Sequence, residues 1–222
     1  MERIGSDPTR TETRQRLLEA AGEVFAARGF RAATVREICQ RAQANLAAVN
    51  YHFGDKERLY AAVLQYTFHC AEPLPRDLGR SGEASVEERL RAFIRSHLFS
   101  LLAEGQPAWH RKLIAREMAE PTQALDTVVD QTIRPEAELL MAIVRDVLGP
   151  DATPQRVWQC ASSIIGQCLF YYHTRPVITR LDPEQTFTPE ALAQLVDHIT
   201  HFSLAALRQF AQHPEGDVGC TL

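Results

Sequence analysis

The chain has 222 residues, of which 45% are apolar and 23% are charged, a balance typical of a folded protein with a buried core. The net charge is −4, but residues 1–60 carry 10 Lys/Arg and 8 Asp/Glu while residues 61–222 carry 14 and 20, which favours an anion-facing N-terminal part. No apolar run reaches the roughly 18–20 residues of a membrane span, and the polar N-terminus does not resemble a signal peptide.

Helical periodicity runs almost unbroken along the chain and no stretch alternates as a strand would, so we predict an all-α fold of about nine helices. The first helix is predicted over Thr13–Arg28, with Gly29 at a position that favours a left-handed cap. Thr34 and Glu37 match a capping box, in which each side chain bonds the backbone of the other. That box predicts a short helix ending near Ala42.

A second short helix follows the turn at Gln43-Ala44. Asn45 is its predicted N-cap, and it spans Leu46 to Tyr51 or His52. Gly54-Asp55 then breaks the chain, and Asp55 is expected to cap a longer helix from Lys56 to about Ala71. The next segment, residues 73–85, holds two Pro and two Gly and is interpreted as the linker between an N-terminal domain, 1–72, and a C-terminal domain, 86–213.

Five longer helices are predicted after the linker. The first begins at the capping box Ser85–Glu88, and the second spans Ala108–Ala119. A long helix, Gln123–Leu148, contains Pro135, whose ring and missing N–H predict a kink near residues 130–134. Threonine followed by proline at 153–154 and 188–189 indicates an N-cap with proline in the first turn. These two pairs predict helices over residues 154–174 and 189–212, followed by a disordered tail after residue 214.

The two short helices and their tight turn have the anatomy of a helix-turn-helix, whose second helix enters the DNA major groove. Small or apolar residues at its start would let the backbone approach base edges and thymine methyls. Phe53 is expected to fill the small core instead of touching DNA. A plain three-helix bundle with no DNA-binding role fits the spacing as well. The candidate DNA contacts are Thr34, Arg36, Gln43, Ala44, Asn45, Leu46, Ala47, Ala48, Asn50, Tyr51, His52 and Lys56, with Arg10 and Arg14 as further phosphate contacts.

Several features between Arg14 and Leu64 occur together, namely Ala20-Ala21, Phe25, Gly29-Phe30, Thr34 with Ile38, Tyr51-His52-Phe53-Gly54, Lys56 and Leu59. In this combination the stretch resembles the DNA-binding domain of the TetR family of bacterial transcriptional regulators. The resemblance implies an all-α homodimer with an N-terminal DNA-reading domain and a C-terminal ligand and dimer domain. Residues 50–53, 117–122 and 133–135 also resemble the CecR-like branch.

The resemblance is incomplete at the start of the second short helix. Many family members begin this helix with a Ser-Lys-Gly-Thr-like sequence, whereas this chain has Asn45-Leu46-Ala47-Ala48. Leu46 therefore stands where a lysine is usual, and Asn50 occupies a position that is often aromatic. The operator sequence of other members does not transfer to this chain, and Asn50 is left open between a base contact and a phosphate contact.

The C-terminal half offers a dimer face and an effector pocket. The helix from Pro154 is apolar nearly all round and the last helix carries a wide apolar stripe, so the two are expected to form a four-helix homodimer interface or simply the monomer core. A two-fold dimer would read half-sites about 34–36 Å apart. Aromatic residues with a few polar groups would suit a small, largely apolar effector, although plain packing explains each of them equally well. The candidates are Phe93, His97, Trp109, Leu113, Glu117, Met118, Val129, Trp158, Ile165, Tyr172 and His173.

Other chemistry has little support in the sequence. There is no Walker-type loop, dinucleotide fingerprint or nucleophile elbow, so an enzyme is not expected and no cofactor is assigned. His198 and His201 have helical spacing but lack further evident metal ligands. The five cysteines form no C-x-x-C pair, which favours reduced thiols in a cytoplasmic protein.

The resulting hypothesis is a ligand-responsive repressor that binds double-stranded operator DNA as a homodimer and has no membrane partner. Ligand in the C-terminal domain would tilt the long helices and move the helix that begins at Lys56, so that the half-sites no longer match. The rivals are an enzyme or small-molecule carrier that lost DNA binding, a redox or metal sensor, and an activator instead of a repressor.

Overall fold

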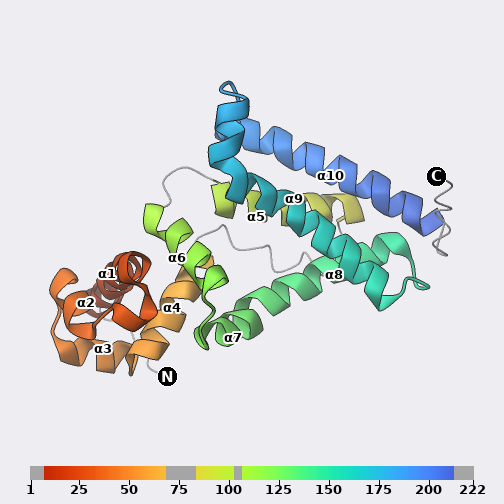
Figure 1. The fold of residues 1–222 in the computed structure, drawn as a ribbon. Coiled ribbons are helices and arrows are strands. Elements are labelled where there is room, and N and C mark those ends of the chain that lie inside the picture. Colours follow the sequence, from red (N-terminus) through yellow and green to blue (C-terminus); the bar gives the residue numbers. More distant parts are fainter. Residues whose placement is uncertain (1–7, 69–83, 103–106, 213–222) are drawn as a thin grey trace. The chain divides into compact units, whose positions relative to one another are not determined.

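The computed structural model describes residues 8–68, 84–102 and 107–212 (Figure 1). Within these ranges every regular element is helical, which confirms the predicted all-α fold. The helices fall into two compact units. The first contains α1 (Pro8–Ala32), α2 (Val35–Arg41), α3 (Leu46–His52), α4 (Lys56–Phe68), α6 (Ala108–Ala119), α7 (Ala124–Val128) and η1 (Val129–Ile133), and the second contains α5 (Val86–Leu102), α8 (Arg134–Leu148), α9 (Pro154–Leu181) and α10 (Pro189–Gln212).

The core of the first unit forms where α1 packs against α2, α4 and α6. The Phe25 ring meets the edge of the Tyr60 ring at a centroid distance of 4.8 Å, and both side chains are buried. Gly22 of α1 lies directly against the indole of Trp109, so that even a methyl group at this position would overlap the ring. A glycine on α1 thus permits the close approach of α6.

The helix α1 differs from the prediction mainly at its start. It begins at Pro8 instead of Thr13, and proline suits the first turn because its missing N–H has no helical partner there. The regular backbone is interrupted at Gly29, directly after the predicted end at Arg28, and a short helical stretch then continues to Ala32. Gly29 interrupts the helix with φ 79° and ψ 166°, a combination that side chains disfavour. The Arg116 guanidinium also lies within 3.4 Å of where a Cβ of Gly29 would be. Glycine is needed here both for its backbone angle and for its lack of a side chain.

The predicted kink before Pro135 takes the form of a π-helical turn, η1, which joins α7 and α8 without a gap. Proline lacks the N–H that would bond the carbonyl four residues earlier, so the ladder is broken at this point. If α7, η1 and α8 are counted as one interrupted helix, the described residues hold the nine helices predicted.

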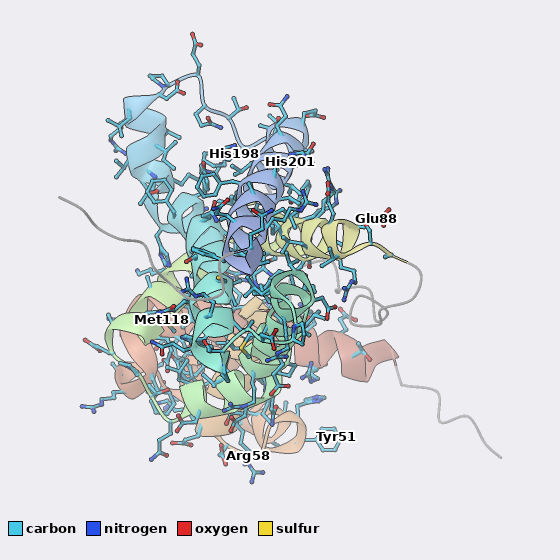
Figure 2. All side chains as sticks on the ribbon, turned by 90° about the vertical axis from the view of Figure 1, so that its right-hand side faces the viewer. Tyr51, Arg58, Glu88, Met118, His198 and His201 are labelled. Carbon is cyan, nitrogen blue, oxygen red and sulfur yellow. The ribbon has the colours of Figure 1, made fainter. Side chains whose placement is uncertain are left out.

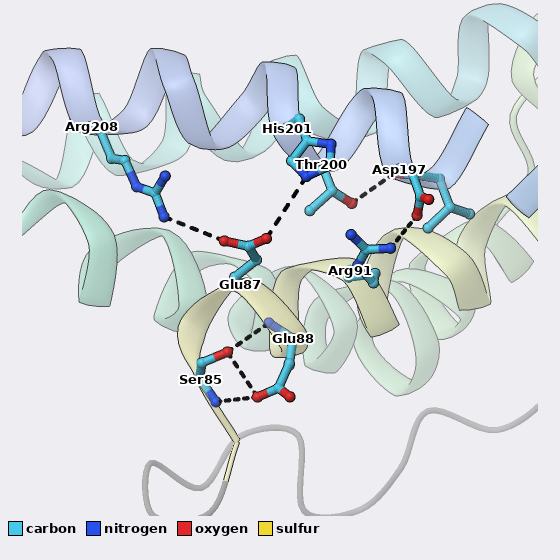
Figure 3. A network of polar contacts seen from close by, with 9 residues as sticks. Ser85, Glu87, Glu88, Arg91, Asp197, Thr200, His201 and Arg208 are labelled. Carbon is cyan, nitrogen blue, oxygen red and sulfur yellow. Dashed lines mark hydrogen bonds and ion pairs between the residues drawn. The ribbon is translucent and has the colours of Figure 1, made fainter. Parts of the chain in front are cut away.

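The second unit is built from four helices, with α10 packed on α5 and α8 packed on α9. The capping box at the start of α5 is complete, since Glu88 N–H donates to Ser85 Oγ (3.2 Å) while Ser85 N–H donates to Glu88 Oε2 (2.7 Å; Figure 3). Arg91 of α5 also pairs with Asp197 of α10. The core of this unit includes Leu90, Phe93, Ile94, Leu98, Leu140, Ile143, Val144, Val157, Ile164, Cys168, Leu192, Val196, Ile199 and Leu204.

The prediction for α9 is wrong at its end. The helix continues to Leu181 instead of stopping at Thr174, with Pro176 inside it. The Arg175 guanidinium lies 4.6 Å from the Phe187 ring centroid, which packs the last turns of α9 against the segment that leads into α10. The proline therefore does not end the helix here, although its missing N–H favours a helix end.

The predicted division at residues 73–85 falls almost wholly outside the described residues and stays a prediction, as does the tail after residue 214. The two compact units differ from the predicted domains, because residues 107–133 pack with the N-terminal helices. Among the described helices, none is both long enough and apolar enough to cross a membrane.

Candidate nucleic-acid interface and effector site

The short helices α2 and α3 are each fixed at their start by a side-chain cap. Thr34 Oγ1 accepts from Glu37 N–H (3.2 Å), and Asn45 Oδ1 accepts from Ala48 N–H (2.9 Å), and both caps were predicted. The returning half of the predicted capping box differs, because the Glu37 carboxylate accepts a hydrogen bond from Arg28 Nε of α1 (2.8 Å) and so ties α2 to α1. The caps set where both helices begin and therefore how they face each other.

The turn between α2 and α3 is held by Gln43, which is the only described non-glycine residue with positive φ (52°). The Cys39 thiol, buried beneath the turn, donates to the Asn45 carbonyl (3.5 Å). Val49 is the buried residue of α3 and anchors it to the core. These contacts orient α3 with Val49 inward and the opposite side outward.

The outward side of α3 is exposed and mostly apolar. Leu46 is 54% exposed and Tyr51 is 65% exposed, and Figure 2 shows the Tyr51 side chain standing clear of the ribbon. Ala47 and Asn50 are also exposed, while Ala48 and His52 are half-buried. A DNA contact by this open face of α3 stays a prediction.

Phe53 is buried, which confirms its predicted place in the small core, and the Arg14 guanidinium lies 5.3 Å from its ring centroid. Thr34 and Arg36 of α2 and Gln43 of the turn are exposed, and Ala44 is half-buried. The Tyr51 and His52 rings meet edge to face at 5.0 Å.

Lys56 has a structural role that sequence reasoning missed. Its Nζ donates to the Arg31 carbonyl (3.4 Å) and lies 4.7 Å from the Phe30 ring centroid. The ammonium thus caps the end of α1 and makes a cation–π contact. A phosphate contact from Lys56 stays a prediction.

Both halves of the chain match known protein families. Residues 17–63 match the model of the bacterial regulatory proteins of the tetR family. Residues 86–207, more than half of the chain, match the C-terminal domain of the HTH-type transcriptional dual regulator CecR. The chain belongs to the TetR family of bacterial transcriptional regulators.

Individual TetR-family relatives align over most of the chain. The dual regulator CecR of Shigella flexneri is 28% identical over 79% of this chain and 85% of its own. The repressor NicS of Pseudomonas putida is 26% identical over 89% of this chain and 93% of its own. The solved structure of the fatty acid degradation regulator FadR from Bacillus halodurans shares the fold, with a TM-score of 0.60 and 17% identity over 87% of this chain and 99% of that one. This TetR-family member is therefore a DNA-binding transcriptional regulator and not an enzyme, as predicted.

The residues predicted for the effector pocket divide between the two units of this TetR-family protein. Trp109, Leu113, Glu117, Met118 and Val129 belong to the first unit, and Phe93, His97, Trp158, Ile165, Tyr172 and His173 belong to the second. The pocket as a whole stays a prediction.

Within the first unit, Glu117 is 1% exposed and fully engaged. Its Oε2 accepts from the Tyr60 hydroxyl (2.6 Å), and its Oε1 accepts from the N–H (2.8 Å) and the hydroxyl (2.9 Å) of Thr122. Burial, followed by the hydrogen bond to Glu117, raises the pKa of Tyr60. This buried junction links α4, α6 and the turn after α6. Sequence reasoning missed it, although Glu117 shares a helix face with buried His110 and Leu113, where a carboxylate requires partners.

The other residues of this half pack differently. Leu113 is buried in the core of the first unit, and Trp109 contacts the His110 ring at 4.0 Å. Met118 is 49% exposed and Val129 opens η1. A cavity of about 730 Å³ lies between α4 and α7, beside the junction, and none of the predicted pocket residues lines it. Its walls are formed by Phe30, Arg31, Glu57, Arg58, Tyr60, Ala61, Ala62, Gln65, Pro121, Thr122, Gln123, Ala124, Thr127 and Gln131.

In the second unit, His97 stacks on Phe93 at 4.5 Å and its Nε2 lies 3.5 Å from Glu136 Oε2. Burial lowers the pKa of His97 to about 4, so the imidazole is neutral at physiological pH. Tyr172 is buried and Ile165 half-buried against the core, whereas Trp158 is 58% exposed and His173 is exposed.

His198 and His201 of α10 do not form part of a cluster of metal-binding side chains within the described residues. His201 Nε2 lies 3.9 Å from Glu87 Oε1, and Arg208 pairs with Oε2 of the same carboxylate (Figure 3). His198 packs beside the Phe202 ring. The part of the chain that the structure describes holds no group of three or more His, Cys, Asp or Glu side chains suited to a metal. Burial raises the pKa of the thiols of Cys39, Cys160 and Cys168, which disfavours the reactive thiolate.

Proposed function

We propose that this TetR-family protein is a repressor that binds a palindromic operator as a homodimer and is released by a small, largely apolar effector in the cytoplasm. The observation that carries the proposal is the exposed outer face of α3, fixed by its caps and by buried Val49. An isolated HTH unit reads one half-site, and a two-fold pair reads a palindrome. The repressor NicS and the dual regulator CecR, both aligned over most of their length, support repression.

The homodimer is supported by an exposed row along α9. Residues three or four apart lie on one helix face, and Phe170, Val177 and Leu181, spaced by seven and then four residues, form a row in which each is more than half exposed. The small Gly166 lies one turn before Phe170 on this face, with no atom within 4 Å of the place a Cβ would take. Phe202 of α10 is 61% exposed.

A groove of about 430 Å³ runs beside Gly166 between α9 and α10. It is lined by Ser163, Gly166, Gln167, Phe170, Tyr171, His198 and Ile199. The exposed Phe170 side chain of one copy could fill the groove beside Gly166 of a second copy. Such self-complementarity is what a two-fold interface requires. We assign this face of α9 and α10 to self-association.

The effector response would use the Tyr60–Glu117–Thr122 junction. It links α4, which follows the recognition helix, to α6 and to the turn that leads into α7. A ligand that binds better when this junction is broken would shift α4 and alter the spacing of the half-sites, with coupling of about 1–3 kcal/mol.

Two measurements test the proposal. Binding to a fragment of the chain's own upstream promoter is measured across a salt series, with random DNA as competitor. We expect a steep loss of affinity with salt, a preference for the promoter and two chains per palindrome. Absence of binding at about 50 mM salt would contradict DNA recognition. Release of the bound DNA by peroxide or zinc, and not by any apolar compound, would replace the effector with redox or metal sensing.

The dimer is tested by sedimentation. Phe202→Glu should shift the protein from dimer to monomer, because the charge would be buried against the partner copy. Met118→Glu is the matched control, since Met118 is 49% exposed and belongs to the first unit, whereas this face belongs to the second. A dimer that survives Phe202→Glu at micromolar concentration would move the interface elsewhere.

A further inference from the structure

The recognition helix α3 carries no charged residue that could read guanine. Its sequence is Leu-Ala-Ala-Val-Asn-Tyr-His, with no lysine or arginine. A bidentate contact from Arg or Lys to O6 and N7 of guanine is the commonest specific contact in the major groove. The helix therefore reads its site by other chemistry.

The cations closest to α3 in the sequence are Arg41, Lys56 and Arg58, and none of them belongs to α3. Arg41 pairs with Glu23 of α1, Lys56 bonds the Arg31 carbonyl, and Arg58 lies 3.6 Å from Asp55. Arg14 of α1, more distant in sequence, lies over the Phe53 ring. These cations can neutralise backbone phosphates at the edge of the site, but phosphate contacts carry no base information.

The leading end of α3 is apolar and open. Leu46 is 54% exposed, and Ala47 beside it is exposed as well. Exposure of a leucine side chain to water does not stabilise the folded protein. Ala47 lies on the same face as Tyr51, four residues on and 65% exposed. The first residues of a recognition helix are those that meet base edges. The only apolar group that the bases present in the major groove is the 5-methyl of thymine.

We infer that Leu46 and Ala47 recognise thymine 5-methyl groups, so that each half-site of the operator contains at least one T·A pair identified by its methyl. The inference rests on the proposed function, because it requires α3 to lie in the major groove. It adds to that function the base, thymine, that the exposed start of α3 would select. The Asn45 side chain does not supply this contact itself, because its amide is polar and its Oδ1 caps α3.

Removal of single methyl groups tests the inference. The full-length protein first selects its preferred site from a random duplex library. Each thymine of that site is then replaced by deoxyuridine, which keeps every hydrogen-bonding atom and deletes only the methyl. We expect one or more positions per half-site where this change weakens binding by about fourfold per methyl, and by roughly the square of that factor when both half-sites are changed.

A variant series assigns the effect to its residue. Leu46→Ala should abolish the penalty of deoxyuridine at one position while leaving the others unchanged. Met118→Ala is the matched control, because Met118 is a large side chain of similar exposure in the same unit. Circular dichroism melts of both variants show that the fold is intact.

The outcomes separate this inference from the proposed function. Sequence-specific binding that stays within twofold at every deoxyuridine substitution would overturn the methyl readout and leave the regulator standing. A penalty that persists unchanged in Leu46→Ala and in Ala47→Gly would do the same. If the unmodified protein selects no preferred site from the library, both the proposed operator recognition and the methyl readout are rejected.

Discussion

The Tyr60 hydroxyl donates a 2.6 Å hydrogen bond to Glu117, and both side chains are almost wholly shielded from water. Tyr60 belongs to α4 and Glu117 to α6, so the bond joins the helix after the DNA-reading element to a helix 57 residues further along the chain. A buried carboxylate is tolerated only with its hydrogen bonds satisfied.

Removal of the Tyr60 hydroxyl should be costly. Tyr60→Phe leaves one Glu117 oxygen without its donor, and we expect a loss of about 1–3 kcal/mol in unfolding free energy by urea denaturation. Tyr51→Phe, which changes an exposed tyrosine in the same way, should stay within about 0.5 kcal/mol. If Tyr60→Phe also stays within that range, the junction does not stabilise the first unit. A double-mutant cycle with Glu117→Gln would measure the coupling between the two side chains.

Gly22 should not tolerate a side chain. In Gly22→Ala the new methyl would overlap the Trp109 indole, and we expect a loss of roughly 1–3 kcal/mol from overpacking, despite the better helix propensity of alanine. Trp109→Leu in the same chain should recover part of the loss, because it makes room for the methyl. Additive effects of the two changes would show that α1 and α6 do not meet at this point.

His97 should give the protein an acid-sensitive component. Its pKa is lowered to about 4 in the folded state, so the unfolded chain takes up a proton first as the pH falls below about 6.5. The contribution of neutral His97 to the free energy of unfolding is fully present above that pH and is lost as the pH falls from about 6.5 to about 4. We expect a loss on the order of 2 kcal/mol, because the nearby Glu136 carboxylate partly stabilises the protonated imidazole. His97→Gln should flatten this part of the stability curve in urea titrations at each pH. Parallel curves for the two proteins would show that His97 protonates with equal ease in both states.

Local structure followed from local sequence. Asn45, Asp55, Thr153 and Thr188 all cap the helices they were expected to cap, because a cap is a contact between residues three positions apart. The family resemblance of residues 14–64 was likewise predictable, since its motifs are contiguous. The buried place of Phe53 followed from the same stretch.

Long-range structure was harder to predict. The bond between Tyr60 and Glu117 joins distant residues, and nothing adjacent to either one specifies the other. The helix α9 continues through Pro176 to Leu181, and the sequence around the proline does not indicate this. The second role of Lys56 arises from the position of the α1 end, which no local pattern reveals.

The central claim is that the outer face of α3 enters DNA, and one pair of variants tests it most directly. Ala47→Asp places a negative charge on that face, while Ala115→Asp places the same charge on an exposed site of α6 in the same unit. Repulsion by the phosphates and bases should weaken operator binding by Ala47→Asp about 100-fold or more, measured by fluorescence anisotropy at fixed salt, whereas Ala115→Asp should remain within about threefold. Equal and small losses in the two variants, with both folded, would contradict the account.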